Sequence, residues 1–319
     1  MNTLENNTQK TGRGVPRNGF RMTTNRRLQM EAAKAHGIEI DMDDFKAKPD
    51  FLQNLITQKA SMPVHIPVEE SYEDVRLKVQ ERFKVIEEIT LSVCMGVSPA
   101  MILCGAGGVG KSSIVKKTIK ELGLTDVKYI NGKVSPSALY RLAYESRHRD
   151  SLIVFDDSDD VFFDDTSLQI LKQITDSSED RQVSWHSNRT MFDEEGREIP
   201  TDFEFNGSVI FISNIDFYRE AEGNNKLAPH MKALISRSFV LDVDMKNHNY
   251  YLARLQDVLF DYMDESVYSL DIKNSIFDFM NKEKNSLREL SLRMVKKIRT
   301  LQMTYGPEWQ SKAKIVLCK

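Results

Sequence analysis

The stretch AMILCGAGGVGKSS, residues 100–113, restricts the fold of this chain more than any other feature. An apolar run ends in four glycines within six residues, and a lysine and two serines follow. Glycine lets the backbone adopt positive φ and approach a ligand closely. The helical pattern that starts at Lys111 would turn its unpaired N–H groups and positive dipole end toward this loop. The spacing from Gly105 to Ser112 fits G-x-x-x-x-G-K-[ST], a phosphate-binding loop between a strand and a helix.

This loop predicts a nucleoside triphosphate ligand, which we take to be ATP, together with Mg²⁺. In loops of this kind the lysine reaches the β- and γ-phosphates and the hydroxyl ligates the metal ion. We therefore expect Lys111 to contact phosphate and Ser112 to bind Mg²⁺. The residues expected to hold the nucleotide are Gly105, Ala106, Gly107, Gly108, Val109, Gly110, Lys111, Ser112 and Ser113. A chance glycine-rich turn is the alternative, but such a turn needs neither the apolar strand before it nor the helix after it.

A second acidic element follows at a suitable distance. The run SLIVFDDSDD, residues 151–160, is typical of a buried strand that ends in Asp156 and Asp157. In phosphate-loop enzymes such an aspartate holds Mg²⁺ opposite the loop hydroxyl. We expect this role for Asp156, and we expect Asp157 to orient and deprotonate the attacking water. A solvated turn is the alternative for acids at the end of a strand.

Short apolar runs alternate with helical patterns along the middle of the chain. Runs of this length between helices predict a parallel sheet that is covered on both faces. A helix is also expected from about Ser71, with Asp74 completing its cap. Strands are expected at 100–104, 127–131, 151–155, 208–213 and 238–243, and later helices at about 247–263, 271–282 and 285–304.

The expected fold class is therefore α/β. It consists of a five-stranded parallel sheet flanked by helices, followed by a small all-helical lid domain. We place a basic arm and linker at residues 1–64, the sheet core at 65–244 and the lid at 245–319.

Further polar residues lie where they can serve the same site. The fourth strand ends at Asn214, which would position water beside the γ-phosphate if that strand neighbours the loop strand. Arg237 ends a short helix before the fifth strand. An arginine there is ordinarily a surface charge, but it can also stabilise the charge on a transferred phosphoryl group. The last expected helix opens with NSLRELSLR and offers Arg288 or Arg293 to the nucleotide.

Together these motifs resemble those of the AAA+ ATPases (ATPases associated with diverse activities). GAGGVGKS, LIVFDDSD, VIFISN, ALISRS and SLREL occur in the order typical of that family over about residues 65–305. The resemblance implies Walker A for Lys111 and Ser112, Walker B for Asp156 and Asp157, sensor 1 for Asn214, the arginine finger for Arg237 and sensor 2 for Arg288. The usual Asp-Glu pair is Asp-Asp here, which predicts slow turnover unless the local geometry compensates.

The resemblance also implies a homo-oligomeric ring, expected to be a hexamer. In such a ring Arg237 acts in the neighbouring subunit's site. A looser resemblance, carried by SLIVFDDSDDVF and FEFNGSVIFISN, is to AAA+ proteins encoded by bacteriophages.

A long excursion at residues 181–207 separates the third and fourth strands and is typical of a hairpin with its turn at DEEG. Single-stranded nucleic-acid grooves mix cations with aromatic rings. The excursion offers Arg181, Trp185, His186, Arg189 and Arg197 for such a groove. Viral helicases of the AAA+ class grip DNA with a hairpin at this position. The alternative is an ordinary insertion whose Trp185 packs on the core, and acids at its tip would repel phosphates.

The first 27 residues carry six Lys or Arg against one Glu, a balance of +5 in a chain whose net charge is −3. Such an arm contacts DNA, RNA or an acidic partner, or it is a disordered, solubilising terminus. No apolar run approaches the roughly 18 residues of a membrane span. Three cysteines without metal spacing indicate a reducing compartment. We therefore expect a cytoplasmic protein with no membrane partner, in the host cytoplasm if a phage encodes it.

Three functions stay open at this point. The first is an ATP-driven motor or loader that remodels nucleic acid or nucleoprotein complexes in phage-type replication or recombination. The second is a protein-remodelling ATPase, although NGKVSPSALYRL has no aromatic residue before Val134, where such enzymes usually carry one. The third is a slow nucleotide-gated scaffold, which the Asp-Asp pair suggests.

Overall fold

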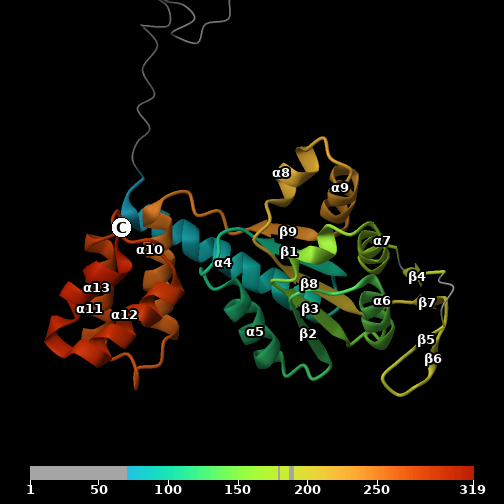
Figure 1. Ribbon diagram of the computed structural model, residues 1–319, viewed down its shortest axis with the longest axis horizontal. Helices are drawn as coiled ribbons and strands as arrows, with labels where there is room; N and C mark the ends of the chain where they lie inside the picture. Colours follow the sequence, from blue (N-terminus) through green and yellow to red (C-terminus); the bar gives the residue numbers. More distant parts are fainter. Residues whose placement is uncertain (1–69, 179, 187–189) are drawn as a thin grey trace, which may run out of the picture. The chain divides into compact units, whose positions relative to one another are not determined.

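The computed structural model describes residues 70–178, 180–186 and 190–319 (Figure 1). These residues lie in one compact unit, Glu70–Lys319. The basic arm and linker expected at residues 1–64 lie outside the described residues, as does the start of the expected core.

A parallel sheet of five strands forms the centre of this unit. The strands are β1 (Ala100–Cys104), β2 (Val127–Asn131), β3 (Leu152–Asp156), β8 (Ser208–Ile212) and β9 (Phe239–Asp242). Their order is β2-β3-β8-β1-β9, and all four pairings are parallel. Each predicted strand is confirmed, with ends that differ by at most one residue. The central strands β1, β3 and β8 are buried at every position, which explains why their sequences are unbroken apolar runs.

Helices cover both faces of the sheet (Figure 1). Alternate side chains of β1 point to opposite faces, so Met101 and Leu103 pack with α4 (Tyr72–Cys94) and α5 (Lys111–Leu122). On the other face Ile102 packs with α6 (Pro136–Glu145) and α7 (Asp165–Ile174). The expected α/β class is thereby confirmed.

Helix α4 begins where the sequence predicted. The Ser71 hydroxyl accepts a hydrogen bond from the Asp74 N–H over 3.1 Å and caps the first turn. Val75, Val79 and Phe83 follow on its buried face.

The excursion before β8 forms two short antiparallel ladders. Strand β4 (Gln182–Ser184) pairs with β7 (Asp202–Glu204), and β5 (Met191–Phe192) pairs with β6 (Glu198–Ile199). The turn between β5 and β6 passes through Gly196 at φ +77°. The hairpin expected here is therefore confirmed, with its tip at DEEG. Shorter elements elsewhere in the core are η1 (Asp159–Phe162), α8 (Phe217–Glu222) and α9 (Ala228–Arg237).

The remaining chain is helical and has a hydrophobic core of its own. Its elements are α10 (His248–Asp257), the π-helical turn η2 (Val258–Tyr262), α11 (Leu270–Lys282), α12 (Leu292–Tyr305), η3 (Gly306–Glu308) and α13 (Trp309–Leu317). The helices expected at 247–263 and 271–282 are present. No helix in the described part of the chain is both long and apolar enough to cross a membrane.

The last helix differs from its prediction. It was expected from residue 285, but α12 begins at Leu292 because the Ser291 hydroxyl caps it by accepting from the Met294 N–H over 3.1 Å. Residues 283–286 form a turn instead, and Leu287 forms an isolated antiparallel bridge with Cys318. That bridge is possible because α13, which the sequence analysis missed, returns the chain to this segment.

Candidate functional site

The loop between β1 and α5 has the backbone that the glycines predicted. Gly105, Gly108 and Gly110 all have positive φ, at +111°, +75° and +97°. A Cβ atom on Gly108 would lie 2.7 Å from the Ser291 Cβ, so the close approach of the lid requires glycine there. The loop therefore exposes bare backbone at the start of α5, which begins at Lys111.

Lys111 lies under this loop and is buried. Its ammonium donates to the carbonyl oxygens of Gly105 and Ala106 over 2.6 and 2.9 Å, and to Asn214 Oδ1 over 2.9 Å. Burial lowers the pKa of Lys111, while the nearby Asp157 carboxylate acts in the opposite direction. The predicted phosphate lysine and the predicted sensor amide are thus in direct contact.

Ser112 and Asp156 form the pair that we expected to hold magnesium. The Ser112 hydroxyl donates to Asp156 Oδ1 over 2.7 Å, and Asp156 Oδ2 accepts from the Lys116 ammonium over 3.1 Å. Hydroxyl and carboxylate oxygens suit Mg²⁺, which usually takes one or two protein ligands beside phosphate oxygens and water. Within the described residues no group of three or more His, Cys, Asp or Glu side chains gathers as a metal site by itself. The donors present fit a magnesium ion shared with phosphate.

Asp157 completes a line of contacts across the site. The Asn214 amide donates from Nδ2 to Asp157 Oδ1 over 3.1 Å, while its Oδ1 accepts from Lys111. The Asp157 backbone has φ +56° and its N–H donates to the Ile212 carbonyl. Because β8 lies between β1 and β3, this bond places the residue after β3 directly beside Asn214 after β8.

A pocket of about 230 Å³ joins these groups to the lid. Its walls include Lys111, Asp157 and Asn214 from the core and Arg293 and Lys296 from α12. The Leu292 N–H donates to the Gly108 carbonyl over 2.8 Å, so α12 starts directly at the phosphate loop. The N-termini of two helices, α5 and α12, therefore border one pocket. Its walls also include the positively charged side chains Lys111, Arg293 and Lys296, so the pocket favours binding of a multiply charged anion.

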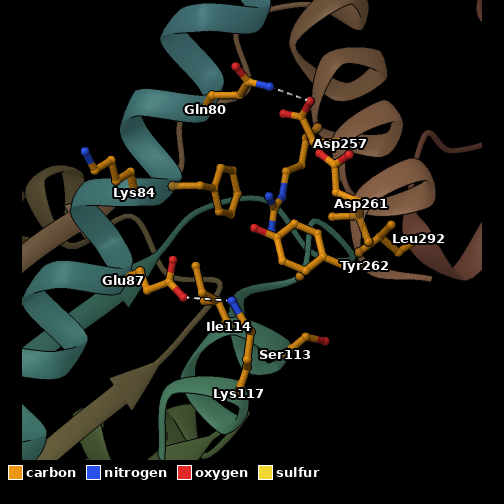
Figure 2. Close-up of a pocket in the computed structure, with 14 residues that line it drawn as sticks. Gln80, Lys84, Glu87, Ser113, Ile114, Lys117, Asp257, Asp261, Tyr262 and Leu292 are labelled. Carbon is orange, nitrogen blue, oxygen red and sulfur yellow. Dashed lines mark hydrogen bonds and ion pairs between the residues drawn. The ribbon is translucent and has the colours of Figure 1, made fainter. Parts of the chain in front are cut away.

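A second pocket, of about 480 Å³, continues from the first. The two share Gly110, Ser113 and Leu292. Figure 2 shows side chains of α4, α5 and the lid facing one another around it, with a hydrogen bond from Gln80 to Asp257. This space lies beside the phosphate loop and is bordered by apolar and aromatic side chains as well as charged ones.

Arg254 of α10 lies at the wall of this second pocket. Its guanidinium is 3.5 Å from the centre of the Phe83 ring, and its Nε donates to the Val109 carbonyl over 3.2 Å. Burial lowers the pKa of Arg254 to about 10, so it keeps its charge at neutral pH. Arg254 was not among the predicted site residues. An arginine between Ala253 and Leu255, which are both buried, is nevertheless a signal, because an arginine is rarely buried unless its charge has a partner.

The structure separates the two candidate lid arginines. Arg293 lines the phosphate pocket from the first turn of α12. The expected residue, Arg288, lies before that helix, where its Nε donates to the Cys318 carbonyl over 3.2 Å. The displaced start of α12 is the reason, because it removes Arg288 from the turn that faces the loop.

Arg237 lies apart from both pockets, at the end of α9. Its Nε pairs with Asp176 Oδ2 at 3.0 Å, and its Nη1 donates to the Ala233 carbonyl. Hydrogen bonds from Ser178, and then from Arg237, lower the pKa of Asp176 to about 2. The hydrogen bonds of Arg237 are thus directed to Asp176 and Ala233 and not to the loop between β1 and α5.

Two of the side chains proposed for nucleic-acid contact, Trp185 and Arg181, pack against neighbouring elements of the core. Trp185 packs edge-on against Tyr140, with ring centres 5.5 Å apart. The Arg181 guanidinium lies 5.2 Å from the Phe205 ring centre and donates to the Ile174 carbonyl.

At the tip of the excursion, Arg197 pairs with Asp193 and Glu195, each at 2.8 Å. His186 is exposed, and Arg189 lies outside the described residues. For Trp185 and Arg181 the geometry favours the alternative of an insertion that packs on the core, while Arg197 is exposed but paired with acids of the tip.

Comparison with known proteins gives one close relative. No family model matches the chain. A protein of Enterobacteria phage T4, described as an uncharacterized 36.7 kDa protein in the nrdC-mobD intergenic region, is 34% identical over 248 residues. The match covers 76% of this chain and 75% of the relative.

Solved structures give more distant likenesses. The Thermotoga maritima RuvB Holliday junction branch migration motor is 12% identical with a TM-score of 0.42, over 75% of this chain and 68% of that one. Cdc6p from Pyrobaculum aerophilum is 15% identical with a TM-score of 0.42, over 80% and 70%. PCH-2 from C. elegans is 15% identical with a TM-score of 0.30, over 78% and 67%. These values are too low to indicate a substrate.

An identity of 34% over about three quarters of each chain shows that the two proteins are members of one family. The chain therefore belongs to the same family as this phage T4 protein.

Proposed function

We propose that this protein is a magnesium-dependent ATPase of the AAA+ class that works as a ring motor or loader on nucleic acid or nucleoprotein complexes. The observation that carries the ATPase assignment is the contact line Lys111–Asn214–Asp157 beside the Ser112–Asp156 pair. The role that we propose is in phage-type replication or recombination, and a relative encoded by a phage is consistent with a place in the host cytoplasm.

The two pockets suggest how a nucleotide lies. Phosphates belong in the smaller pocket, against Lys111 and the helix N-termini, and the nucleoside belongs in the larger pocket beside Phe83 and Tyr262. The shared wall at Gly110 and Ser113 is then where the two parts join.

Hydrolysis follows from the same side chains. Lys111 holds the terminal phosphates, and Asn214 and Asp157 hold the water, with Asp157 taking its proton. Ser112 and Asp156 would hold Mg²⁺, which neutralises charge on the phosphate oxygens when it is bound. Arg293 faces the phosphates from the lid, and Arg237 of an adjoining subunit in a ring would stabilise the transferred phosphoryl group.

A protein-remodelling role is the second candidate, and the excursion at residues 181–207 favours it. Arg197 is paired with acids and Arg181 is stacked on Phe205, and the tip carries Glu194 and Glu195. An acidic tip of this kind would attract a basic protein surface rather than phosphates.

ATP turnover measured with Mg²⁺, with and without single-stranded DNA, duplex DNA and RNA, tests both candidates. We expect measurable hydrolysis that a nucleic acid stimulates several-fold. The Lys111→Ala variant is the control. It should lose nucleotide binding because it lacks the ammonium that lies under the loop in the wild type. Hydrolysis that no nucleic acid alters would favour the protein remodeller, and retained ATP binding in Lys111→Ala would contradict the site.

A further inference from the structure

Asp156 carries a buried carboxylate that forms an ion pair with the ammonium of Lys116. The Asp156 side chain is 9% exposed. One oxygen accepts from the Ser112 hydroxyl, and the other lies 3.1 Å from the Lys116 ammonium. The neighbouring Lys111 is not in direct contact with this carboxylate, because its ammonium donates to the loop carbonyls and Asn214 instead.

The position of Lys116 follows from the helix. It lies four residues after Ser112 on α5, one turn further on the same face, which brings it to the second oxygen of the same carboxylate. Its side chain is 51% exposed, and its ammonium is also 5.7 Å from the centre of the Tyr129 ring on β2. Lys116 thus lies between the carboxylate and an aromatic face at the rim of the site.

We propose that Lys116 is a built-in counter-ion of Asp156 that competes with the divalent cation for this carboxylate and so sets the magnesium affinity of the site. The inference rests on the proposed function in one respect only, that Ser112 and Asp156 are the metal-binding pair. It concerns a residue outside the motifs that identify the family.

The competition follows from simple electrostatics. A buried carboxylate is costly unless a cation lies beside it, and Lys116 supplies that cation before any metal binds. A divalent cation at the same carboxylate repels the ammonium, so the ammonium has to withdraw. A lysine is suited to this because its charge sits on a flexible four-carbon stem. The Tyr129 ring offers a face toward which it can move.

Removal of this charge should have two effects of opposite sign. Without Lys116 the metal-free protein is less stable, because Asp156 is left buried with no cation beside it. The divalent cation, in contrast, binds more tightly because it no longer displaces an ammonium. A lysine that only supports the fold would give the first effect without the second.

The test uses the full chain and Mn²⁺, which is visible by electron paramagnetic resonance, titrated in the presence of saturating ADP. We expect Lys116→Met to lower the Kd for Mn²⁺ about tenfold and Lys116→Arg to remain close to the wild type. In metal-free buffer, Lys116→Met should lower the melting temperature by several degrees, and added Mn²⁺ with ADP should restore most of it. Lys120→Met, at an exposed lysine one turn further along α5, is the matched control and should change neither value.

Equal or weaker Mn²⁺ binding by Lys116→Met would overturn the inference. Weaker ADP binding by this variant without any metal would also overturn it, because Lys116 would then be a phosphate ligand. A wild-type protein that binds ADP but no Mn²⁺ would instead remove the proposed metal pair itself, so the two failures are distinguishable.

Discussion

Asp157 combines a left-handed backbone with a hydrogen-bonded carboxylate. Its φ of +56° lies in a region that Asp and Asn enter more readily than most residues with a Cβ atom. This preference gives a physical reason for a short acid here, where AAA+ proteins usually carry Glu. The Asn214 amide holds one oxygen of the carboxylate, which fixes the direction of the side chain.

Replacement of this acid separates binding from chemistry. Asp157→Asn should keep ATP affinity, since asparagine tolerates the same φ, but should slow hydrolysis by a factor of about 100 or more because no base takes the proton of the water. Single-turnover hydrolysis and ATP binding would be measured side by side. Asp160→Asn, at an exposed acid three residues on, should behave as the wild type. Normal turnover in Asp157→Asn would move the catalytic role to another residue.

At the scale of elements, the start of α12 decides which arginine lines the pocket that we propose for the phosphates. The Ser291 cap places Arg293 in the first turn, at the phosphate pocket, and leaves Arg288 bonded to Cys318. Helix ends are the part of a helix that apolar periodicity defines least well, which is why the start expected at residue 285 differs from the observed start at Leu292. The difference between the two positions is visible only once the loop contact at Leu292 is known.

The two arginines make a matched pair of variants. Arg293→Ala should weaken ATP binding about tenfold or more, as expected for loss of a charge-assisted contact with phosphate. Arg288→Ala should leave ATP affinity unchanged, since this side chain meets only a carbonyl at the C-terminus of the chain. Isothermal titration with a slowly hydrolysed ATP analogue would measure both. A larger loss for Arg288→Ala than for Arg293→Ala would reverse the assignment.

At the scale of the whole molecule, the sheet explains how much the sequence could predict. Lys111, Asp156 and Asn214 were identifiable because each lies at or shortly after the end of a buried strand, and parallel strands end at one edge of a sheet. Their mutual contacts depend on the order β1-β8-β3, which local patterns do not contain. Arg254 was missed for the same reason, because its partners Phe83 and Val109 are distant in sequence and meet it only through packing.

If the protein works as the proposed ring, each active site needs Arg237 from an adjoining subunit. Arg237→Ala should lose ATP turnover while keeping ATP binding, since Arg237 contacts neither pocket of its own chain. Mixing it with Asp157→Asn subunits should restore part of the activity, because each variant supplies what the other lacks. Turnover of the mixture at several ratios, with assembly checked by mass, is the measurement. Intact mixed rings without any restored turnover would argue that Arg237 does not act across an interface.

The bond from the Leu292 N–H to the Gly108 carbonyl consists of main-chain atoms alone. Every amino acid except proline brings the same donor to position 292, so divergence of side chains leaves this tie intact. A relative can therefore carry a different side chain at this position and keep the contact between the lid and the loop. A change of the loop on release of ADP would then be transmitted to the lid through main-chain atoms.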